Sequence, residues 1–488
     1  MSEKRYFKIF SERHTIGTQN KYVILFTELE KADQENDEDL KKNLKIKGVQ
    51  TDFISADKNY LYHLILRSLN EFYHAKNLNF KIKESLLSIE ILLRKGLYDE
   101  CMKLIEKNEA LAIECENFQL MIELLNWKKN CGAYSLGSYK AHEINLSIDK
   151  YLRLLNNVKK MADLFYQINL IRDEVDQRNK QVDLEKINDI FKQPELLDKQ
   201  YVLSFSANIY YHLSYANYYY LFDNPQKELV HLQELIDSLN SSKIYAIEHP
   251  LDYLTTYNKL IGVKLKLNDN SFIDDVNCLK DFTKKVLLHK DLVAYRIFIH
   301  TSSHKLEYYL LNNDFPKVID KCEFIEKEFL KSDIIIEPYH MLYFYYVFTT
   351  ALVYLGEFNK ALKYLNDALN DFEEKDNPKV YIRLELLNLI VHFELKNDRL
   401  VNSFGKKMLS SNSYSFHLNS CEKKIVTTLI KIVGVKHITS QKESALLKKL
   451  LESSSNDKNW KHSLLLNECY QKWVTAKYNK KLVKDFYK

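Results

Sequence analysis

Glycine and proline are scarce in this sequence. Its 488 residues include only 9 Gly and 6 Pro, whereas average usage would give roughly 34 and 24. Glycine frees the backbone for tight turns and proline breaks helices, so both residue types interrupt regular structure. Their scarcity predicts long helices with few sheets.

Cysteine is sparse and shows no disulfide framework. The chain has seven, an odd number, and no two of them form a C-x-x-C pair. They stand at positions 101, 115, 131, 278, 322, 421 and 469. This usage predicts reduced thiols, as expected in a cytoplasm.

No hydrophobic run is long enough to cross a bilayer. The most apolar window, Met341–Leu355, has about 15 residues and includes two Thr, whereas a spanning helix needs roughly 20 apolar residues. The first residues, MSEKRYFKIFSERHTIG, lack the apolar core and the cleavage site of a signal peptide. With 46% hydrophobic and 28% charged residues, the chain is expected to be a folded, soluble, cytoplasmic protein.

Signatures of catalysis are missing as well. The sequence has no G-x-x-x-x-G-K-[ST] loop, no G-x-G-x-x-G and no G-x-S-x-G. We therefore expect neither catalysis nor a cofactor, although a Cys–His pair that meets only in the fold stays open. His300 and His304 are one helical turn apart, a spacing that can bind a metal. Because no third ligand is indicated, a solvated or groove-facing polar pair is the preferred interpretation.

What is present is a helical hairpin between Met341 and Phe372. Apolar residues three and four positions apart fall on one face of a helix. In the first helix these are Tyr345, Phe348 and Leu352, and in the second Phe358, Ala361, Leu365, Ala368 and Leu369. Gly356 stands where the chain reverses, a place for a residue that tolerates positive φ. The stretch predicts two antiparallel helices joined by a short turn.

The same pattern recurs along the chain. An earlier hairpin turns at residues 95–97, with Tyr98, Cys101 and Ile105 on the seam of its second helix. From Tyr201 onward, turns rich in Asn, Asp or Gly are predicted at residues 223–224, 269–270, 313–314, 356–357 and 397–398. Their spacing of about 43 residues is typical of stacked helical arrays. Between about residues 133 and 194 the helices look long, with polar turns at 172–173 and 177–181.

The hairpin residues carry a family resemblance. Gly356, Phe358, Ala361, Leu365 and Ala368 match the spacing of a tetratricopeptide repeat, which the stretch resembles. It departs from that pattern at the small residue of the first helix, here Thr, and in the late position of its closing proline. The segments KYVILF, KNYLYHLILRSLNEFY, LLRKGLYDECMKLIEK and WVTAKYNKKLVKDFYK also resemble those of an uncharacterised family of bacterial helical-repeat proteins. Both resemblances imply one elongated α-solenoid, and neither brings an assigned activity.

The tetratricopeptide resemblance implies a groove, lined by the first helix of each hairpin, that binds extended peptides. Carried over by phase, the groove residues are Tyr210, Asn217, Tyr257, Lys264, His300, Glu307, Tyr343, Tyr346, Thr350, Glu385, Asn388 and His392. Tyr, amide and charged side chains together can hold a peptide by stacking and hydrogen bonds. Several of these Tyr could instead pack between helices. The regular Lys/Asn set with which some relatives clamp a C-terminal carboxylate is missing.

The two ends differ from the middle. Residues 1–75 predict an N-terminal helical cap, with helices at Lys21–Lys31 and Glu38–Lys47 and a third capped by Ser55. A helix-turn-helix that reads DNA is the alternative for this segment. Residues 76–403 are expected to hold the array, and residues 404–488 to close it. That last region has 17 Lys, no Arg and six acids, a formal charge of +11. Its final amphipathic helix would contain Trp460, Leu464, Leu465, Cys469 and Trp473.

These observations predict an all-α solenoid of stacked helical hairpins that acts as a non-catalytic protein- or peptide-binding scaffold. One alternative is a cytoplasmic regulator whose array senses a peptide and signals to the N-terminal helices. The other is a nucleic-acid binder that uses the basic C-terminal region. Because that charge is all Lys, and Arg is the usual reader of phosphate and guanine, a solvated surface is the preferred interpretation. No membrane partner is expected.

Overall fold

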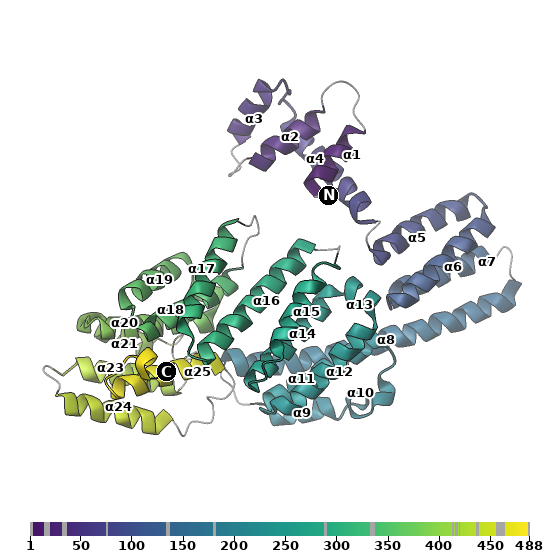
Figure 1. The fold of residues 1–488 in the computed structure, drawn as a ribbon. Coiled ribbons are helices and arrows are strands. Elements are labelled where there is room, and N and C mark those ends of the chain that lie inside the picture. The colour runs from purple at the N-terminus through teal and green to yellow at the C-terminus, as the bar shows by residue number, and fades with distance from the viewer. Residues whose placement is uncertain are drawn as a thin grey trace. The chain divides into compact units, whose positions relative to one another are not determined.

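The structure is a computed structural model that describes residues 3–13, 20–31, 37–74, 77–132, 137–178, 182–286, 290–331, 337–411, 414, 418, 420–435, 439–454 and 464–486. Every regular element within these residues is a helix, and none of them is a strand. The predicted all-α class is confirmed (Figure 1). No helix among the described residues is long and apolar enough to cross a membrane.

The chain divides into two compact units within α8 (Gly137–Arg178), between Asn156 and Asn157. The predicted boundaries near residues 75 and 403 stay predictions. The first unit contains α1 (Glu3–Glu12), α2 (Lys21–Lys31), α3 (Asp37–Ile46), α4 (Ile54–His74), α5 (Leu78–Arg94), α6 (Tyr98–Glu114), α7 (Phe118–Gly132) and the start of α8.

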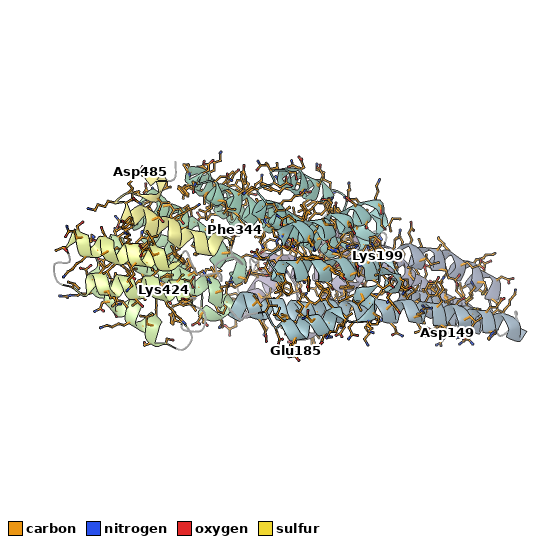
Figure 2. All side chains as sticks on the ribbon, turned by 90° about the horizontal axis from the view of Figure 1, so that it is seen from below. Asp149, Glu185, Lys199, Phe344, Lys424 and Asp485 are labelled. Carbon is orange, nitrogen blue, oxygen red and sulfur yellow. The ribbon has the colours of Figure 1, made fainter. Side chains whose placement is uncertain are left out.

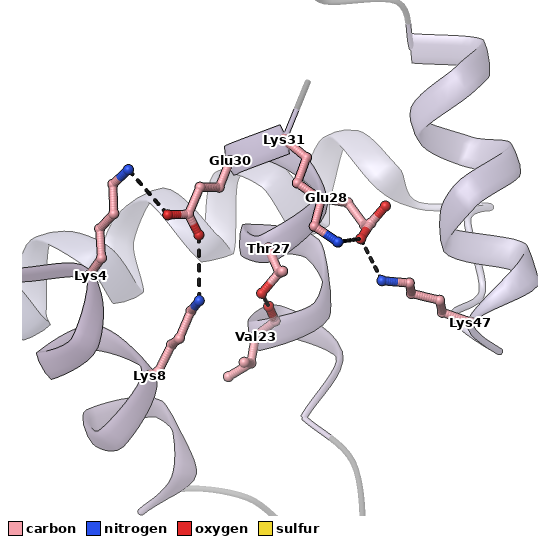
Figure 3. A network of polar contacts seen from close by, with 8 residues as sticks. All are labelled: Lys4, Lys8, Val23, Thr27, Glu28, Glu30, Lys31 and Lys47. Atoms are coloured by element: carbon pink, nitrogen blue, oxygen red, sulfur yellow. Dashed lines mark hydrogen bonds and ion pairs between the residues drawn. The ribbon is translucent and has the colours of Figure 1, made fainter. Parts of the chain in front are cut away.

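In the first unit, α1 to α4 share a core of their own. Phe7, Leu25, Leu44 and Leu61, one from each helix, are at most 2% exposed. Ion pairs join these helices (Figure 3). The Glu30 carboxylate pairs with Lys4 Nζ at 3.1 Å and with Lys8 Nζ at 3.4 Å, and the Glu28 carboxylate pairs with Lys31 and Lys47. Four basic residues of the segment for which DNA reading is the alternative are thus ion-paired within it.

The hairpin of α5 and α6 and the following α7 form the second core of this unit. Cys101 on α6 and Cys131 on α7 are both 0% exposed, and their Sγ atoms lie 2.8 Å apart. Burial raises the pKa of the Cys101 thiol to about 12. The scattered positions of the cysteines in the sequence gave no sign of this contact.

The second unit starts with the rest of α8 and continues through helices that pack in chain order. Its early helices are α9 (Leu184–Phe191), α10 (Pro194–Leu197), η1 (Lys199–Tyr201), α11 (Phe205–Leu221), α12 (Pro225–Ser241), α13 (Lys243–Glu248), α14 (Pro250–Lys266), α15 (Phe272–Phe282), α16 (Lys290–Leu311) and α17 (Phe315–Lys331). The later ones are α18 (Pro338–Leu355), α19 (Phe358–Asp371), η2 (Glu374–Asp376), α20 (Pro378–Glu394), α21 (Asp398–Ser410), α23 (Ser420–Val433), α24 (Ser440–Ser454), α25 (Leu464–Tyr478) and α26 (Val483–Phe486). Side chains fill the spaces between them, as Phe344 of α18 illustrates (Figure 2).

Left-handed residues end the first helices of the pairs. Asp223, Asn268, Asn313, Gly356 and Lys396 have φ between 51° and 79°. After each of them, the next amide donates to the carbonyl five residues back, as Glu357 does to Leu352 at 2.9 Å. This closes the last helical turn and sends the chain back along its partner helix. The predicted turn positions are confirmed to within a residue or two.

Some local predictions were wrong. α8 is one helix of 42 residues, so the polar pair at residues 172–173 is not a turn, because Arg172 and Asp173 continue its helical run. α4 begins at Ile54, so Ser55 is inside the helix and does not cap it. The helix α1 was not predicted, although its Phe7 and Phe10 have helical spacing. Trp460 lies outside the described residues, as do the side chains of Leu464, Leu465 and Cys469.

Candidate functional site: the first-helix face

The first helices of successive pairs, α11, α14, α16, α18 and α20, are the elements on which the groove was predicted. α14, α16, α18 and α20 each contact the next in this order, and a hydrogen bond from Lys259 to Asn217 joins α14 to α11. We call the surface that these helices form, together with the side chains that reach it, the first-helix face. The twelve predicted residues all lie on these helices, but their environments differ.

At the α11 end, Asn217 is a buried polar hub. Its side-chain oxygen accepts from Arg172 of α8 at 3.3 Å and from Lys259 of α14 at 2.8 Å, and its amide donates to Asn169 at 2.6 Å. The side chain is 1% exposed. Asn217 therefore ties three helices together.

Tyr210 of α11 is half-buried against aromatic rings of α8. Its ring centroid lies 5.7 Å from that of Phe165 and 6.4 Å from that of Tyr166. Burial raises the pKa of its hydroxyl to about 12. The phenol is thus neutral at physiological pH and can act as a hydrogen-bond donor.

The two predicted residues of α14 point into the helix packing. Tyr257 is 3% exposed, its ring lies tilted against that of Tyr253 at a centroid distance of 4.8 Å, and its hydroxyl accepts from Asn240 at 3.5 Å. Lys264 makes a 2.5 Å ion pair with Asp275 of α15. Both side chains hold neighbouring helices together.

A row of histidines joins α14, α16 and α18. His304 Nε2 lies 2.7 Å from Asn258 Oδ1, and His304 Nδ1 is 3.8 Å from Glu307. The His300 ring meets that of His340 edge-on at 6.4 Å. Burial, with the neighbouring histidines and Arg296, lowers the pKa of His300 to about 4. His300 and His304 therefore contact different partners, and no group of three or more metal-ligating side chains occurs in the described chain.

On α18, Tyr343 is half-buried, whereas Tyr346 and Thr350 are 0% exposed. The Thr350 hydroxyl donates to the Tyr346 carbonyl at 2.8 Å. Tyr346 thus belongs to the hydrophobic core of this unit, and Thr350 is buried beside it, so neither can be reached by a peptide on the surface.

On α20, burial raises the pKa of Glu385, which lies 3.9 Å from Lys407 of α21. His392 is 7% exposed and its Nδ1 lies 3.0 Å from the Asn397 amide. Burial lowers the pKa of His392. Asn388, between them in sequence, is half-buried.

The sequence did not indicate what covers the α16–α20 part of this face. It is the chain's own α25 with α26. Trp473 Nε1 donates to Glu394 Oε1 at 2.9 Å, and Lys477 Nζ donates to Glu394 Oε2 at 2.5 Å. Tyr470 donates to the Arg383 carbonyl at 3.2 Å. In Figure 1, α25 is the yellow helix that returns to lie beside α16, which it contacts.

Two further contacts fix the C-terminal helices on the face. Lys472 donates to the side-chain oxygen of Asn313, at the turn after α16, at 2.9 Å. α26 packs on α18, and a Cβ built on Gly356 would lie 2.9 Å from Leu482. The periodicity of the last helix indicated an apolar face, and Trp473 is 4% exposed as that predicts.

A separate cleft of about 630 Å³ lies between α8 and α9. Its walls include Leu164, Leu170 and Ile190 with charged residues of both signs. None of the twelve predicted residues lines it.

Comparisons with known proteins give no identification. No model of a protein family matches the chain, and no curated protein or solved structure matches it significantly. The tetratricopeptide and bacterial-family resemblances therefore rest on the sequence patterns and on the all-helical, sequentially packed pairs that the structure contains.

Proposed function

We propose that this chain is a non-catalytic scaffold of tetratricopeptide-like repeats that binds a segment of another protein on its first-helix face. The observation that carries the proposal is the way α25 binds to this face. There the face accepts a helix through an indole N–H, a lysine ammonium and a tyrosine hydroxyl. Trp and Tyr are among the residue types that dominate protein–protein recognition when they are anchored in well-packed surroundings.

The chemistry of the face supports helix or peptide recognition. Half-buried Tyr210 and Tyr343 offer rigid amphipathic rings, while Glu394 and Asn313 provide oriented acceptors. Such a mixture gives specificity by hydrogen bonding and affinity by apolar burial. A peptide-sensing regulator would use the same face, with a change of compactness as its output.

Position-specific crosslinking in cells tests the proposal. A photoreactive phenylalanine analogue is placed at Tyr210 or at Tyr343 of the full chain. Matched controls carry it at Lys227 of α12 or Lys363 of α19, two exposed positions on second helices. We expect the two first-helix positions to capture the same polypeptide and the two controls to miss it. Equal capture from all four positions would reject the first-helix face as the binding surface.

Nucleic-acid binding through residues 404–488 is the alternative that a salt titration separates. Part of that lysine charge is paired in the structure, since Lys477 binds Glu394 and Lys407 lies 3.9 Å from Glu385. Lys472 is held by a hydrogen bond to Asn313. A protein that neutralises several phosphates loses affinity steeply as salt rises. We expect no such salt-dependent binding of duplex DNA or single-stranded RNA; a steep slope would favour the alternative.

A further inference from the structure

The C-terminal helices contact more of the second unit than a terminal cap requires. A cap shields the last pair of an array from water, and α25 does pack on α24. It also reaches Asn313 at the end of α16, while α26 contacts α18. These partners lie well over one hundred residues earlier in the chain, so the segment folds back along the array.

The contacts with α20 have the character of a recognition site. One carboxylate, Glu394, binds both Trp473 and Lys477, which are one helical turn apart on α25. The Trp473 ring meets the edge of Phe393 at 6.1 Å, and Lys477 Nζ lies 5.2 Å from the same ring. An aromatic residue followed four positions later by a lysine is therefore bound by one Phe–Glu pair.

α25 and α26 add to the burial of α18 and α20, which also pack against neighbouring helices on several sides. Each has a hydrophobic face toward its hairpin partner, yet residues all around both helices are buried. Tyr470, Trp473, Val474 and Val483 belong to the same core cluster as these two helices. Apolar residues that would otherwise line an open groove are thus covered by the chain itself.

We propose that α25 and α26 form an intramolecular ligand that occupies the helix-binding face until a competing helix displaces it. The competing partner is an amphipathic helix with aromatic residues at the positions of Tyr470 and Trp473 and a lysine at that of Lys477. This inference rests on the proposed function and adds its regulation. Binding of the partner and undocking of α25 are then a single exchange, because both ligands need Glu394.

The test uses a fluorescently labelled synthetic peptide with the sequence of residues 464–486 and the full-length chain. The wild-type chain should bind it weakly, because its own α25 is present at a high effective concentration. Trp473→Ala in the chain weakens the internal ligand and leaves Glu394 in place, so the peptide should bind roughly tenfold more tightly or better. Lys484→Ala, which changes an exposed residue of α26, is the control and should behave as wild type.

A second change locates the peptide. Adding Glu394→Gln to the Trp473→Ala chain should return the affinity for the peptide to the wild-type level. A peptide that itself carries Trp473→Ala should not bind. If circular dichroism shows that Trp473→Ala unfolds the chain, Lys477→Ala replaces it. A smaller gain in peptide affinity is expected, because the ion pair and the contact with Phe393 are lost while the indole contacts stay. No gain in a folded variant, or a gain that survives Glu394→Gln, overturns the inference.

The outcome is independent of the crosslinking test. If the peptide displaces α25 but crosslinking captures no polypeptide, the chain has an internal ligand and no external partner. In that case the proposed function fails and this inference stands. A captured polypeptide without peptide exchange would mean that α25 is a fixed structural element, so this inference would fail alone.

Discussion

Neighbouring helices pack through different physical interactions at the two ends of the first-helix face. At the α11 end, neighbouring helices meet through a polar hub, where Asn217 binds Arg172 and Lys259. At the α18 end they meet through apolar side chains, and eleven of the eighteen residues of α18 are buried. The polar end satisfies its own hydrogen bonds without an additional helix, whereas the apolar end is completed by α25. A helix that replaces α25 would therefore compete at the apolar end and leave the polar hub intact.

The largest expected effect comes from a buried ion pair at the covered end. Arg383 of α20 and Glu422 of α23 are 2% and 1% exposed, with Nε and Oε1 3.1 Å apart. Glu422→Gln leaves a buried guanidinium without its counter-charge, so we expect roughly 3–5 kcal/mol of destabilisation. Urea unfolding and hydrogen exchange in α20 and α23 measure it. The double change Arg383→Met, Glu422→Leu should recover most of the loss, and a single-variant cost below about 1 kcal/mol would contradict the prediction.

The next largest effect is a pH dependence of the unfolding free energy that comes from the α11 end. His212 is 1% exposed, its Nδ1 lies 3.2 Å from His231 Nδ1, and burial, with His231 and Lys199, lowers the pKa of His212 to about 4. The unfolded chain, with a histidine pKa near 6.5, binds the proton first as pH falls. Stability is therefore full above about pH 6.5 and lost as pH falls toward 4.

For His212 alone this amounts to roughly 2 kcal/mol between pH 7 and pH 5. The measurement is the unfolding free energy of wild type and His212→Gln at both pH values. The unfolding free energy of His212→Gln should change less between the two pH values than that of wild type, by this amount. Parallel curves for the two proteins would show that His212 does not titrate as described.

The polar hub itself should matter less. Asn217→Ala removes an acceptor for Arg172 and Lys259, which are only partly buried and can turn to water. We expect a loss of roughly 1–2 kcal/mol in the unfolding free energy. Because the described hydrogen bonds of α25 go to α20 and to the turn after α16, binding of the 464–486 peptide should stay at the wild-type level. A change in peptide binding would show that the two ends are coupled.

The smallest expected effect measures the contact of Leu482 with the turn at Gly356. Gly356 and Gly96 have φ of 79° and 75°, so alanine at either position costs roughly 1 kcal/mol of backbone strain. A Cβ at Gly96 meets nothing within 4 Å, whereas one at Gly356 lies 2.9 Å from Leu482. Thermal unfolding should therefore show a larger loss for Gly356→Ala than for Gly96→Ala. Equal losses would mean that Leu482 moves aside freely.

Much of the helical framework could be predicted because turns leave local signals. Asp223, Asn313 and Gly356 are of residue types that tolerate a left-handed backbone, and each is left-handed in the structure. Lys396 takes the same conformation without such a signal, so that turn was placed one residue late. The helix α19 showed a clear apolar stripe because one face of it is buried, with Ala361, Leu365 and Ala368 inside.

The candidate site was harder to predict. The helix α18 is apolar all round, and no periodicity can separate the side that faces a hairpin partner from the side that faces α26. Tyr346 and Thr350 were consequently assigned to the groove although they are fully buried. The role of Glu394 depends on residues about eighty positions away, and such a contact leaves no trace in local spacing.

The return of α25 also bears on how the protein is handled in the laboratory. A shortened version that ends before Leu464 would lay bare the aromatic surface of α18 and α20 that Trp473 and Tyr470 now cover. Contiguous apolar surface of this kind promotes self-association and precipitation. Expression trials of such truncations should therefore yield aggregates even though the helices before α25 are all present, and co-expression with the missing segment should restore a monodisperse product.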